Sequence, residues 1–178
     1  MGKSNLSKLE RQFKISMKNK ANIKKNIGIY RKNVGFILQN NNKEILVGKR
    51  YGSAASSWQM PQGGILENEI EEDALSREVY EEIGLAVNSY KIIQKSEGYY
   101  YYTIPEHMRK SIWQNLYIGQ KQRWFLANFT GEDSDINING AFPEFEEWKW
   151  CKPSEVLLQA ISFKQNVYHA IFSDFKLI

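Results

Sequence analysis

The sequence contains little of the chemistry that several kinds of catalytic and metal site require. It has one cysteine, Cys151, which excludes an internal disulfide, fits a reducing cytoplasm and is expected to be an ordinary half-buried strand residue. Its two histidines, His107 and His169, are expected in a loop and a helix, without matched partners for nucleophilic catalysis. They are also too few for a histidine-rich metal site.

Long apolar runs are absent as well. The run at residues 34–38, VGFIL, is typical, and it is far too short to cross a bilayer. The first residues are polar and rich in lysine, without the apolar core of a secretory signal. A cytoplasmic protein without a membrane segment is therefore expected. The chain of 178 residues, 42% of them hydrophobic, is long enough for a single domain with its own core.

The net charge of +4 is concentrated at the N-terminus. Residues 1–30 carry eight Lys or Arg and one Glu, whereas the remaining 148 residues carry 16 basic and 19 acidic side chains. We expect residues 1–30 to be a flexible basic extension and residues 31–178 to form the folded domain. Such an extension can bind RNA or an acidic surface by counterion release. A merely solvated extension, or a translation start at Met17, explains it as well.

The most informative stretch is residues 63–85, GGILENEIEEDALSREVYEEIGL. Its spacing is G-x5-E-x7-R-E-U-x-E-E-x-G-U, where U is aliphatic, and every position of the pattern is filled. With seven fixed residues at roughly 6% usage each, an accidental match is expected in about one such chain in a million. The pattern therefore requires a functional explanation.

Apolar residues recur from position 70 at the intervals of an amphipathic helix: Ile70, Ala74, Val79 and Ile83. Acidic residues at positions 71–73 suit the first turn, and Gly84 is well placed to end the helix. On this helix Glu78, Glu81 and Glu82 fall on one face, where their charges repel. A solvated acidic face is the simple interpretation of three such residues. The fixed glycine, Arg77 and Gly84 favour a different one, in which a hard divalent cation such as Mg²⁺ lies among the oxygens.

The rest of the chain predicts a mixed sheet covered by helices on both faces. Residues 30–38 and 45–50 are strand-like and joined by a polar turn at residues 40–43. A glycine-bearing loop is expected at residues 58–64, with backbone freedom from its paired glycines, and a surface excursion at residues 105–115. Further strands are expected at residues 90–102, 123–130 and 145–151, and helices at residues 153–160 and 164–175.

The pattern at residues 63–85 closely resembles the Nudix box of pyrophosphohydrolases. The strings YRKNVG, WQMPQGG, GQKQRWF, PEFEEW and SFKQNVY are similar to those of one branch, the bacterial RNA 5′-pyrophosphohydrolases and the related asymmetric diadenosine tetraphosphate hydrolases. The resemblance covers roughly residues 31–175. It implies the Nudix fold, an α/β/α sandwich around a mixed β-sheet.

The resemblance also implies roles for individual residues. It assigns metal binding to four carboxylates: Glu78, Glu81, Glu82 and Glu144. Arg77 is expected to orient these carboxylates, and Gly63 is expected to shape the loop that precedes the box residue Glu69. It places six residues around the substrate, basic ones at the polyphosphate and an aromatic one on a base: Arg31, Arg50, Lys121, Arg123, Lys164 and Phe163. Taken singly, each of these six is more simply a surface or core residue.

The expected activity is metal-dependent removal of pyrophosphate from the 5′ end of triphosphorylated or diphosphorylated RNA, with Mg²⁺ as cofactor and Mn²⁺ able to substitute. Catalysis is expected from Arg77 and the carboxylates, with Glu78, Glu82 or Glu144 as the general base. Two alternatives stay open. The first is the hydrolysis of dinucleoside polyphosphates, which the same residues suit. The second is a regulator that binds nucleotide or RNA without hydrolysing it. Loss of a box carboxylate would favour this second alternative, and all of the box carboxylates are present.

Overall fold

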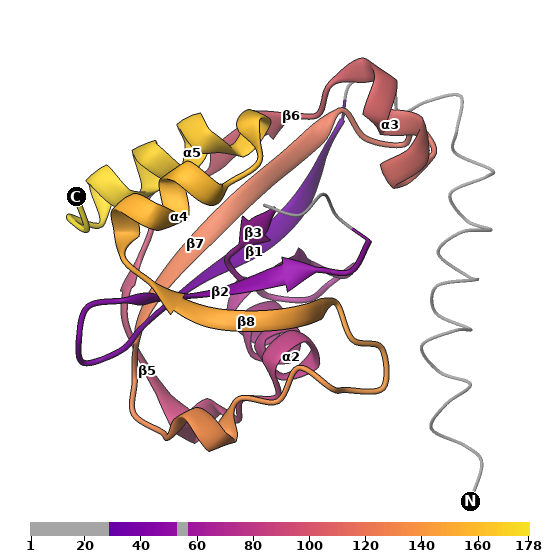
Figure 1. The fold of residues 1–178 in the computed structure, drawn as a ribbon. Coiled ribbons are helices and arrows are strands. Elements are labelled where there is room, and N and C mark those ends of the chain that lie inside the picture. Colours follow the sequence, from indigo (N-terminus) through magenta and orange to yellow (C-terminus); the bar gives the residue numbers. More distant parts are fainter. Residues whose placement is uncertain (1–28, 53–56) are drawn as a thin grey trace, which may run out of the picture.

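A mixed β-sheet lies at the centre of the structure, a computed structural model that describes residues 29–52 and 57–178 (Figure 1). The strands β1 and β7 run parallel, and the other pairings of the described strands are antiparallel. The strands are β1 (Tyr30–Gln39), β2 (Ile45–Arg50), β3 (Trp58–Gln59), β4 (Gln62–Gly64), β5 (Tyr90–Lys95), β6 (Tyr100–Thr103), β7 (Gly119–Phe129) and β8 (Phe145–Cys151).

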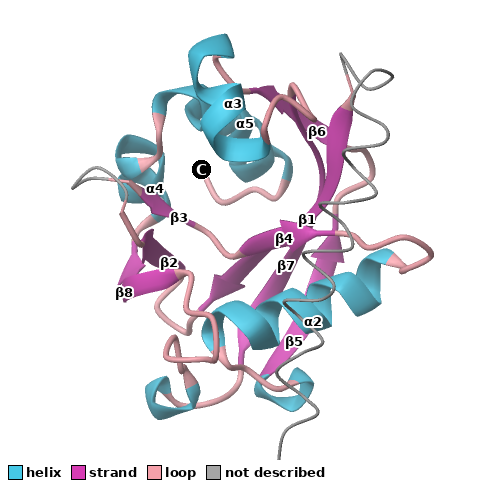
Figure 2. Ribbon diagram, turned by 90° about the vertical axis from the view of Figure 1, so that its right-hand side faces the viewer, coloured by secondary structure: helices cyan, strands magenta, loops and turns pink. Residues whose placement is uncertain are grey.

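Helices cover both faces of this sheet. The α-helices are α2 (Glu71–Ile83), α3 (Glu106–Trp113), α4 (Pro153–Gln159) and α5 (Ser162–Asp174), with short 3₁₀ helices η1 (Val87–Ser89) and η2 (Asp133–Asp135). Figure 2 shows α2 on one side of the sheet and α5 on the other. The predicted α/β/α sandwich around a mixed sheet is confirmed.

Alternation along β7 divides the apolar residues into two cores. Trp124 and Leu126 pack in the core on the α4 and α5 side, and Phe125 and Ala127 pack in the core on the α2 side. Successive side chains of a strand point to opposite faces, so one strand supplies both cores. The same alternation decides which polar side chains of β7 reach which face, and this determines the composition of the site described below.

Several predicted elements are confirmed. The strand at residues 45–50 and the strand at residues 145–151 have the predicted bounds. Strands β1 and β2 form the expected hairpin, with Gln39 opposite Ile45. In α5 the predicted stripe of Val167 and Ile171 is buried, and Phe175 just after the helix is buried with it.

Other predictions are wrong. Residues 90–102 form two strands, because the chain leaves the sheet between β5 and β6, where the carbonyls of residues 96–98 accept hydrogen bonds from Arg123. The loop expected at residues 58–64 contains the short strands β3 and β4. The surface excursion at residues 105–115 contains α3, so His107 lies on a helix. Cys151 on β8 is buried, whereas half-burial was expected.

The predicted basic extension at residues 1–30 lies outside the described residues apart from positions 29 and 30, and Tyr30 already belongs to β1. Among residues 29–52 and 57–178, none of the helices has the length and apolarity needed to span a membrane.

Candidate active site

Helix α2 carries the predicted carboxylates to the edge of β4. It begins with Glu71, Glu72 and Asp73, whose negative charges suit the N-terminal end of the helix dipole. It ends at Gly84, whose φ of 70° is a left-handed conformation that glycine adopts without strain. Both ends agree with the prediction from the sequence.

Gly63 lies directly against the side chain of Glu78. A Cβ atom at Gly63 would lie 1.8 Å from Cδ of Glu78, so no larger residue fits beside this carboxylate. At Gly64 a Cβ atom would lie 2.1 Å from Nη2 of Arg31. Neither glycine has a positive φ, so the predicted backbone freedom is wrong. These glycines instead leave space for a carboxylate and a guanidinium.

Arg77 connects the loop before the helix to the acidic face. Its guanidinium donates to both carboxylate oxygens of Glu69 at 2.8 Å, to the carbonyl of Gly64 at 2.8 Å and to Oε1 of Glu78 at 2.6 Å. These bonds, above all those to Glu69, raise the pKa of Arg77 further above its ordinary value. Burial raises the pKa of Glu78 although Arg77 opposes it. This geometry agrees with the orienting role expected for Arg77.

Glu82 is the most enclosed of the box carboxylates, with 2% of its surface exposed. Its Oε2 accepts a hydrogen bond of 2.9 Å from the backbone N–H of Gln62. Burial, and then the negative charges of Glu144 and Glu78, raise the pKa of Glu82 well above its ordinary value. The three carboxylates therefore share one electrostatic environment, although they come from a helix and from the segment before β8.

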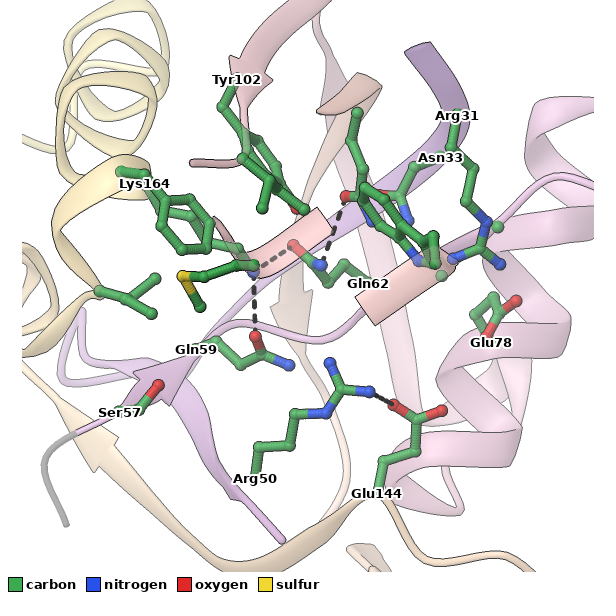
Figure 3. Close-up of a pocket in the computed structure, with 18 of the residues that line it drawn as sticks. Arg31, Asn33, Arg50, Ser57, Gln59, Gln62, Glu78, Tyr102, Glu144 and Lys164 are labelled. Atoms are coloured by element: carbon green, nitrogen blue, oxygen red, sulfur yellow. Dashed lines mark hydrogen bonds and ion pairs between the residues drawn. The ribbon is translucent and has the colours of Figure 1, made fainter. Parts of the chain in front are cut away.

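Glu144 lies opposite the helix, beside Arg50 at the end of β2 (Figure 3). Its Oε2 is 3.9 Å from Nη2 of Arg50, and its backbone carbonyl accepts from the N–H of Tyr51. The ion pair joins two half-exposed side chains, so it contributes little to stability. It does place one acidic and one basic side chain next to each other in the cavity lining.

The donor set fits a hard divalent cation. In the part of the chain that the structure describes, no three acidic, histidine or cysteine side chains form a ready-made metal cage. Magnesium does not require one, since it is usually held by one or two carboxylates together with substrate phosphates. The oxygens of the four predicted carboxylates, Glu78, Glu81, Glu82 and Glu144, are of the type it prefers. A cation among them would relieve the repulsion that adds to the effect of burial in raising the pKa of Glu82.

A cavity of about 710 Å³ extends from Glu78 and Glu144 toward α5, and Figure 3 shows its lining. Glu82 is buried behind this lining. The acidic end is lined by Glu78, Glu81 and Glu144, and basic side chains follow: Arg31, Arg50 and Lys164. Lys164 is buried and donates to Oε1 of Gln59 at 2.9 Å. Burial, and then the charge of Arg50, lower the pKa of Lys164 to about 7.

The far end of the cavity is largely apolar and aromatic. Phe163 and Tyr102 lie there with ring centroids 5.6 Å apart, and residues of β6, α3 and the segments beside them complete the wall: Ile104, Met108, Trp113 and Ile161. Phe163, predicted from the resemblance to stack on a base, packs against Tyr102, which lies on the side of the cavity away from Glu78 and Glu144 (Figure 3). A ligand that fills the cavity would be anionic at one end and planar or apolar at the other.

Lys121 and Arg123 do not line this cavity. Both lie on β7, on the face opposite Gln122 and Trp124, where they stack on the ring of Tyr99 at 4.1 Å and 3.9 Å from its centroid. Arg123 also donates hydrogen bonds to Glu71 in the first turn of α2, and it is not part of the cavity wall. Their substrate-binding role stays a prediction, which the structure does not support by proximity.

A group of buried amides in the cavity floor was not predicted from the sequence. Gln62, Gln120 and Asn33 line the cavity and are joined by hydrogen bonds through Gln122, which is fully buried. One signal was present: Gln120 and Gln122 share the parity of Trp124 in GQKQRWF, so two polar side chains fall on a core-facing side of a strand. Buried polar groups of this kind are usually hydrogen-bonded, and here they pair mainly with one another.

The fold and the acidic helix together define the class of protein. The sequence model of the NUDIX domain matches residues 29–171, and the chain belongs to the NUDIX family. The resemblance seen in the sequence is confirmed. Nudix hydrolases generally use divalent metals, and the carboxylate oxygens on α2 are of a kind that binds such ions.

Relatives that match most of the chain carry a more specific name than the family. The RNA pyrophosphohydrolase of Orientia tsutsugamushi (strain Boryong) is 43% identical over 148 residues, which cover 83% of this chain and 91% of the relative. The RNA pyrophosphohydrolase of Wolbachia sp. subsp. Drosophila simulans (strain wRi) is 45% identical over 150 residues, which cover 84% of this chain and 91% of the relative.

Solved structures support the fold. The E. coli dihydroneopterin triphosphate pyrophosphohydrolase has a TM-score of 0.65 at 18% identity, over 82% of this chain and 99% of that chain. The C. elegans Ap4A hydrolase, in a binary complex, has a TM-score of 0.57 at 15% identity, over 82% of this chain and 99% of that chain. At these identities the likeness concerns the fold alone.

Proposed function

We propose that this protein is a magnesium-dependent RNA 5′-pyrophosphohydrolase, an enzyme that cuts a phosphoanhydride bond and converts a 5′-triphosphate or 5′-diphosphate end to a monophosphate. The observation that carries the proposal is that one cavity is lined by carboxylates, basic side chains and aromatic rings, with Glu78 and Glu144 on one side and Lys164 and Tyr102 on the other (Figure 3). A nucleotide 5′ end has the complementary groups, a polyphosphate and a base. The relatives named RNA pyrophosphohydrolase support this choice of substrate.

The basic side chains bind the polyphosphate. Arg31 and Arg50 line the cavity between the acidic helix and the aromatic end, so they meet the phosphates that lie beyond the attacked phosphorus. Guanidinium groups bind phosphate oxygens by paired hydrogen bonds, which fix the orientation of the chain of phosphates. Orientation of this kind determines which anhydride bond is presented to water.

The carboxylates hold the cation and accept the proton. The four predicted carboxylates would hold Mg²⁺: Glu78, Glu81, Glu82 and Glu144. Arg77 keeps Glu78 in place through its 2.6 Å hydrogen bond. When bound, Mg²⁺ neutralises phosphate charge and lowers the pKa of water. One of these carboxylates accepts a proton from the attacking water, whose oxygen bonds to phosphorus as the bridging oxygen departs with the leaving phosphate group.

A cytoplasmic location is part of the proposal. The chain has one cysteine, Cys151, which is buried in β8, and a protein without disulfides suits a reducing compartment. RNA with a polyphosphorylated 5′ end is the substrate that this compartment would supply.

A side-by-side assay tests the proposal. The purified protein with Mg²⁺ is given a 5′-triphosphorylated oligoribonucleotide and, separately, diadenosine tetraphosphate, and kcat/KM is measured for each. We expect a larger kcat/KM on the RNA. The variant Glu82→Gln, purified in the same way, controls for contaminating phosphatases. A much larger kcat/KM on the dinucleotide would replace the proposal with dinucleoside polyphosphate hydrolysis, and absence of hydrolysis on both would favour a binding role.

A further inference from the structure

Asn33 on β1 presents a donor that the described residues do not satisfy. The side chain is 1% exposed and lines the cavity, and its Nδ2 has no hydrogen-bond partner. A buried N–H group without a partner is costly, so its presence in a folded protein requires an explanation, for example a functional role at a binding site. Because this amide lies in a cavity wall, the missing partner is expected to come from a ligand.

The orientation of the Asn33 amide is determined by its neighbours. The indole Nε1 of Trp124 can only donate, and it donates to Oε1 of Gln122 at 3.2 Å. Nε2 of Gln122 must therefore face the other way, where it donates to Oδ1 of Asn33 at 3.0 Å. Since Gln122 and Trp124 are both fully buried, Asn33 cannot exchange its oxygen and nitrogen without losing this bond. The position of the Asn33 Nδ2 donor is therefore fixed by Gln122 and Trp124 without a ligand.

The surroundings of Asn33 identify the ligand group. Arg31 lies two residues earlier on the same face of β1 and lines the same cavity. On the other side, Gln62 accepts at Oε1 from Gln122 at 3.1 Å and from Nζ of Lys164 at 3.3 Å. Asn33 therefore lies between the guanidinium of Arg31 and the amine of Lys164, two donor groups that can bind an anion (Figure 3).

We propose that Asn33 is a further substrate-binding residue whose Nδ2 donates a hydrogen bond to a non-bridging phosphate oxygen. Gln122 is a positioning residue that holds this amide with its nitrogen toward the substrate. The proposal rests on the proposed function in one respect, namely that the ligand is a polyphosphate. A neutral N–H donor helps to orient the phosphate without adding charge, because a hydrogen bond requires the acceptor oxygen to lie in a particular direction from the donor.

Binding of inorganic tripolyphosphate, measured by calorimetry, tests this directly. A hydrogen bond to a charged acceptor corresponds to a change of about 10- to 100-fold in the dissociation constant. We expect Asn33→Ala to raise the dissociation constant by about that factor, and Asn33→Asp, which replaces the donor with an acceptor, to raise it at least as much. Gln39→Ala removes another buried polar side chain of the same strand, outside the cavity lining, and should leave binding unchanged.

The positioning role of Gln122 has its own readout. Gln122→Glu removes the donor that holds Oδ1 of Asn33, so the Asn33 amide is free to turn and binding should weaken. In a protein that already carries Asn33→Ala, the same change should weaken binding clearly less than it does in the wild-type background, because the part of the loss that acts through Asn33 has already occurred. The loss that is left comes from Gln62 and Gln120, to which Gln122 also donates. Equal losses in both backgrounds would show that Gln122 acts independently of Asn33 and would overturn its assignment.

Several outcomes overturn the assignment of Asn33. These are unchanged tripolyphosphate binding in both Asn33 variants, a wild-type protein that binds no tripolyphosphate, or a loss seen only with an oligonucleotide, which would place another ligand group at Nδ2. Thermal unfolding of each variant confirms that it is folded at the temperature of the titration. If wild-type protein fails to hydrolyse RNA while the losses of tripolyphosphate binding are observed, the proposed function fails and the assignment of Asn33 stands.

Discussion

The backbone N–H of Gln62 donates a 2.9 Å hydrogen bond to Oε2 of Glu82, and so joins β4 to α2 across twenty residues of sequence. Because Glu82 is buried, the bond fixes one oxygen of the carboxylate and the distance between the strand and the helix. The strand lines the cavity, and the helix carries the acids. The Gln62–Glu82 contact therefore sets the relative position of the two walls of the site.

Glu82→Gln should abolish most catalysis and leave the fold intact. The amide oxygen of glutamine can still accept from the N–H of Gln62, but the negative charge needed to hold a cation or accept a proton is lost. We expect kcat to fall by about three orders of magnitude. Removal of a buried charge should leave the melting temperature unchanged or higher.

Asp73→Asn is the matched control, because it removes one carboxylate charge from the exposed first turn of the same helix. Its kcat should stay within about twofold of the wild-type value. Equal activity of Glu82→Gln and Asp73→Asn would contradict the assignment of Glu82.

Arg77→Lys should impair both stability and catalysis. The guanidinium makes paired hydrogen bonds to Glu69 and single ones to Gly64 and Glu78, and a lysine ammonium cannot match this fork. We expect a loss of about 2 kcal/mol in the free energy of unfolding, measured with urea, together with a lower kcat. A variant with wild-type stability and kcat would show that the network does not hold the loop in place.

The buried amine of Lys164 should make stability depend on pH. Its pKa is lowered to about 7 in the folded protein, below the ordinary value of 10.5. Between these values the unfolded chain binds more protons, so Lys164 makes stability rise as pH increases from about 7 to about 10.5, and its cost is fully present below pH 7.

The measurement compares wild-type protein with Lys164→Met across this range. Between pH 7 and pH 10 the free energy of unfolding should rise more for the wild-type protein than for the variant, by on the order of a few kcal/mol. A constant difference at every pH would mean that Lys164 keeps its proton when the protein folds.

Arg123→Lys should reduce the stability of the fold and have little effect on substrate binding. Arg123 joins Glu71 of α2 to the carbonyls of residues 96–98 and stacks on Tyr99. We expect the free energy of unfolding to fall by about 1–2 kcal/mol and KM for RNA to change by less than about twofold. A tenfold rise in KM at unchanged stability would instead support the substrate-binding role expected from the sequence.

The sequence predicted the acidic helix well because local signals coincide there. The spacing of Glu78, Glu81 and Glu82, the acidic first turn and the terminal Gly84 all depend on residues within one helix. Helix α3 and the short strands β3 and β4 were missed because they are too short for a periodic signal, and tertiary packing stabilises them.

The wall opposite the helix was predicted less well, because the role of a strand residue depends on the face to which it points. Lys121 and Arg123 have the opposite parity to Gln122 on β7, and so they point away from the cavity. Asn33 gave no signal of its own in the sequence. Its importance comes from a hydrogen bond with Gln122, 89 residues away, which only the folded chain brings about.

The most direct test of the central claim is product analysis with and without metal. The protein is incubated with a 5′-triphosphorylated oligoribonucleotide in Mg²⁺, and in parallel with the metal removed by EDTA, and the RNA ends are resolved by mass. We expect 5′-monophosphorylated RNA in Mg²⁺ and unchanged triphosphate in EDTA, with activity restored when Mg²⁺ is added back. Unchanged triphosphate ends in Mg²⁺, or equal conversion in EDTA, would contradict a metal-dependent RNA 5′-pyrophosphohydrolase.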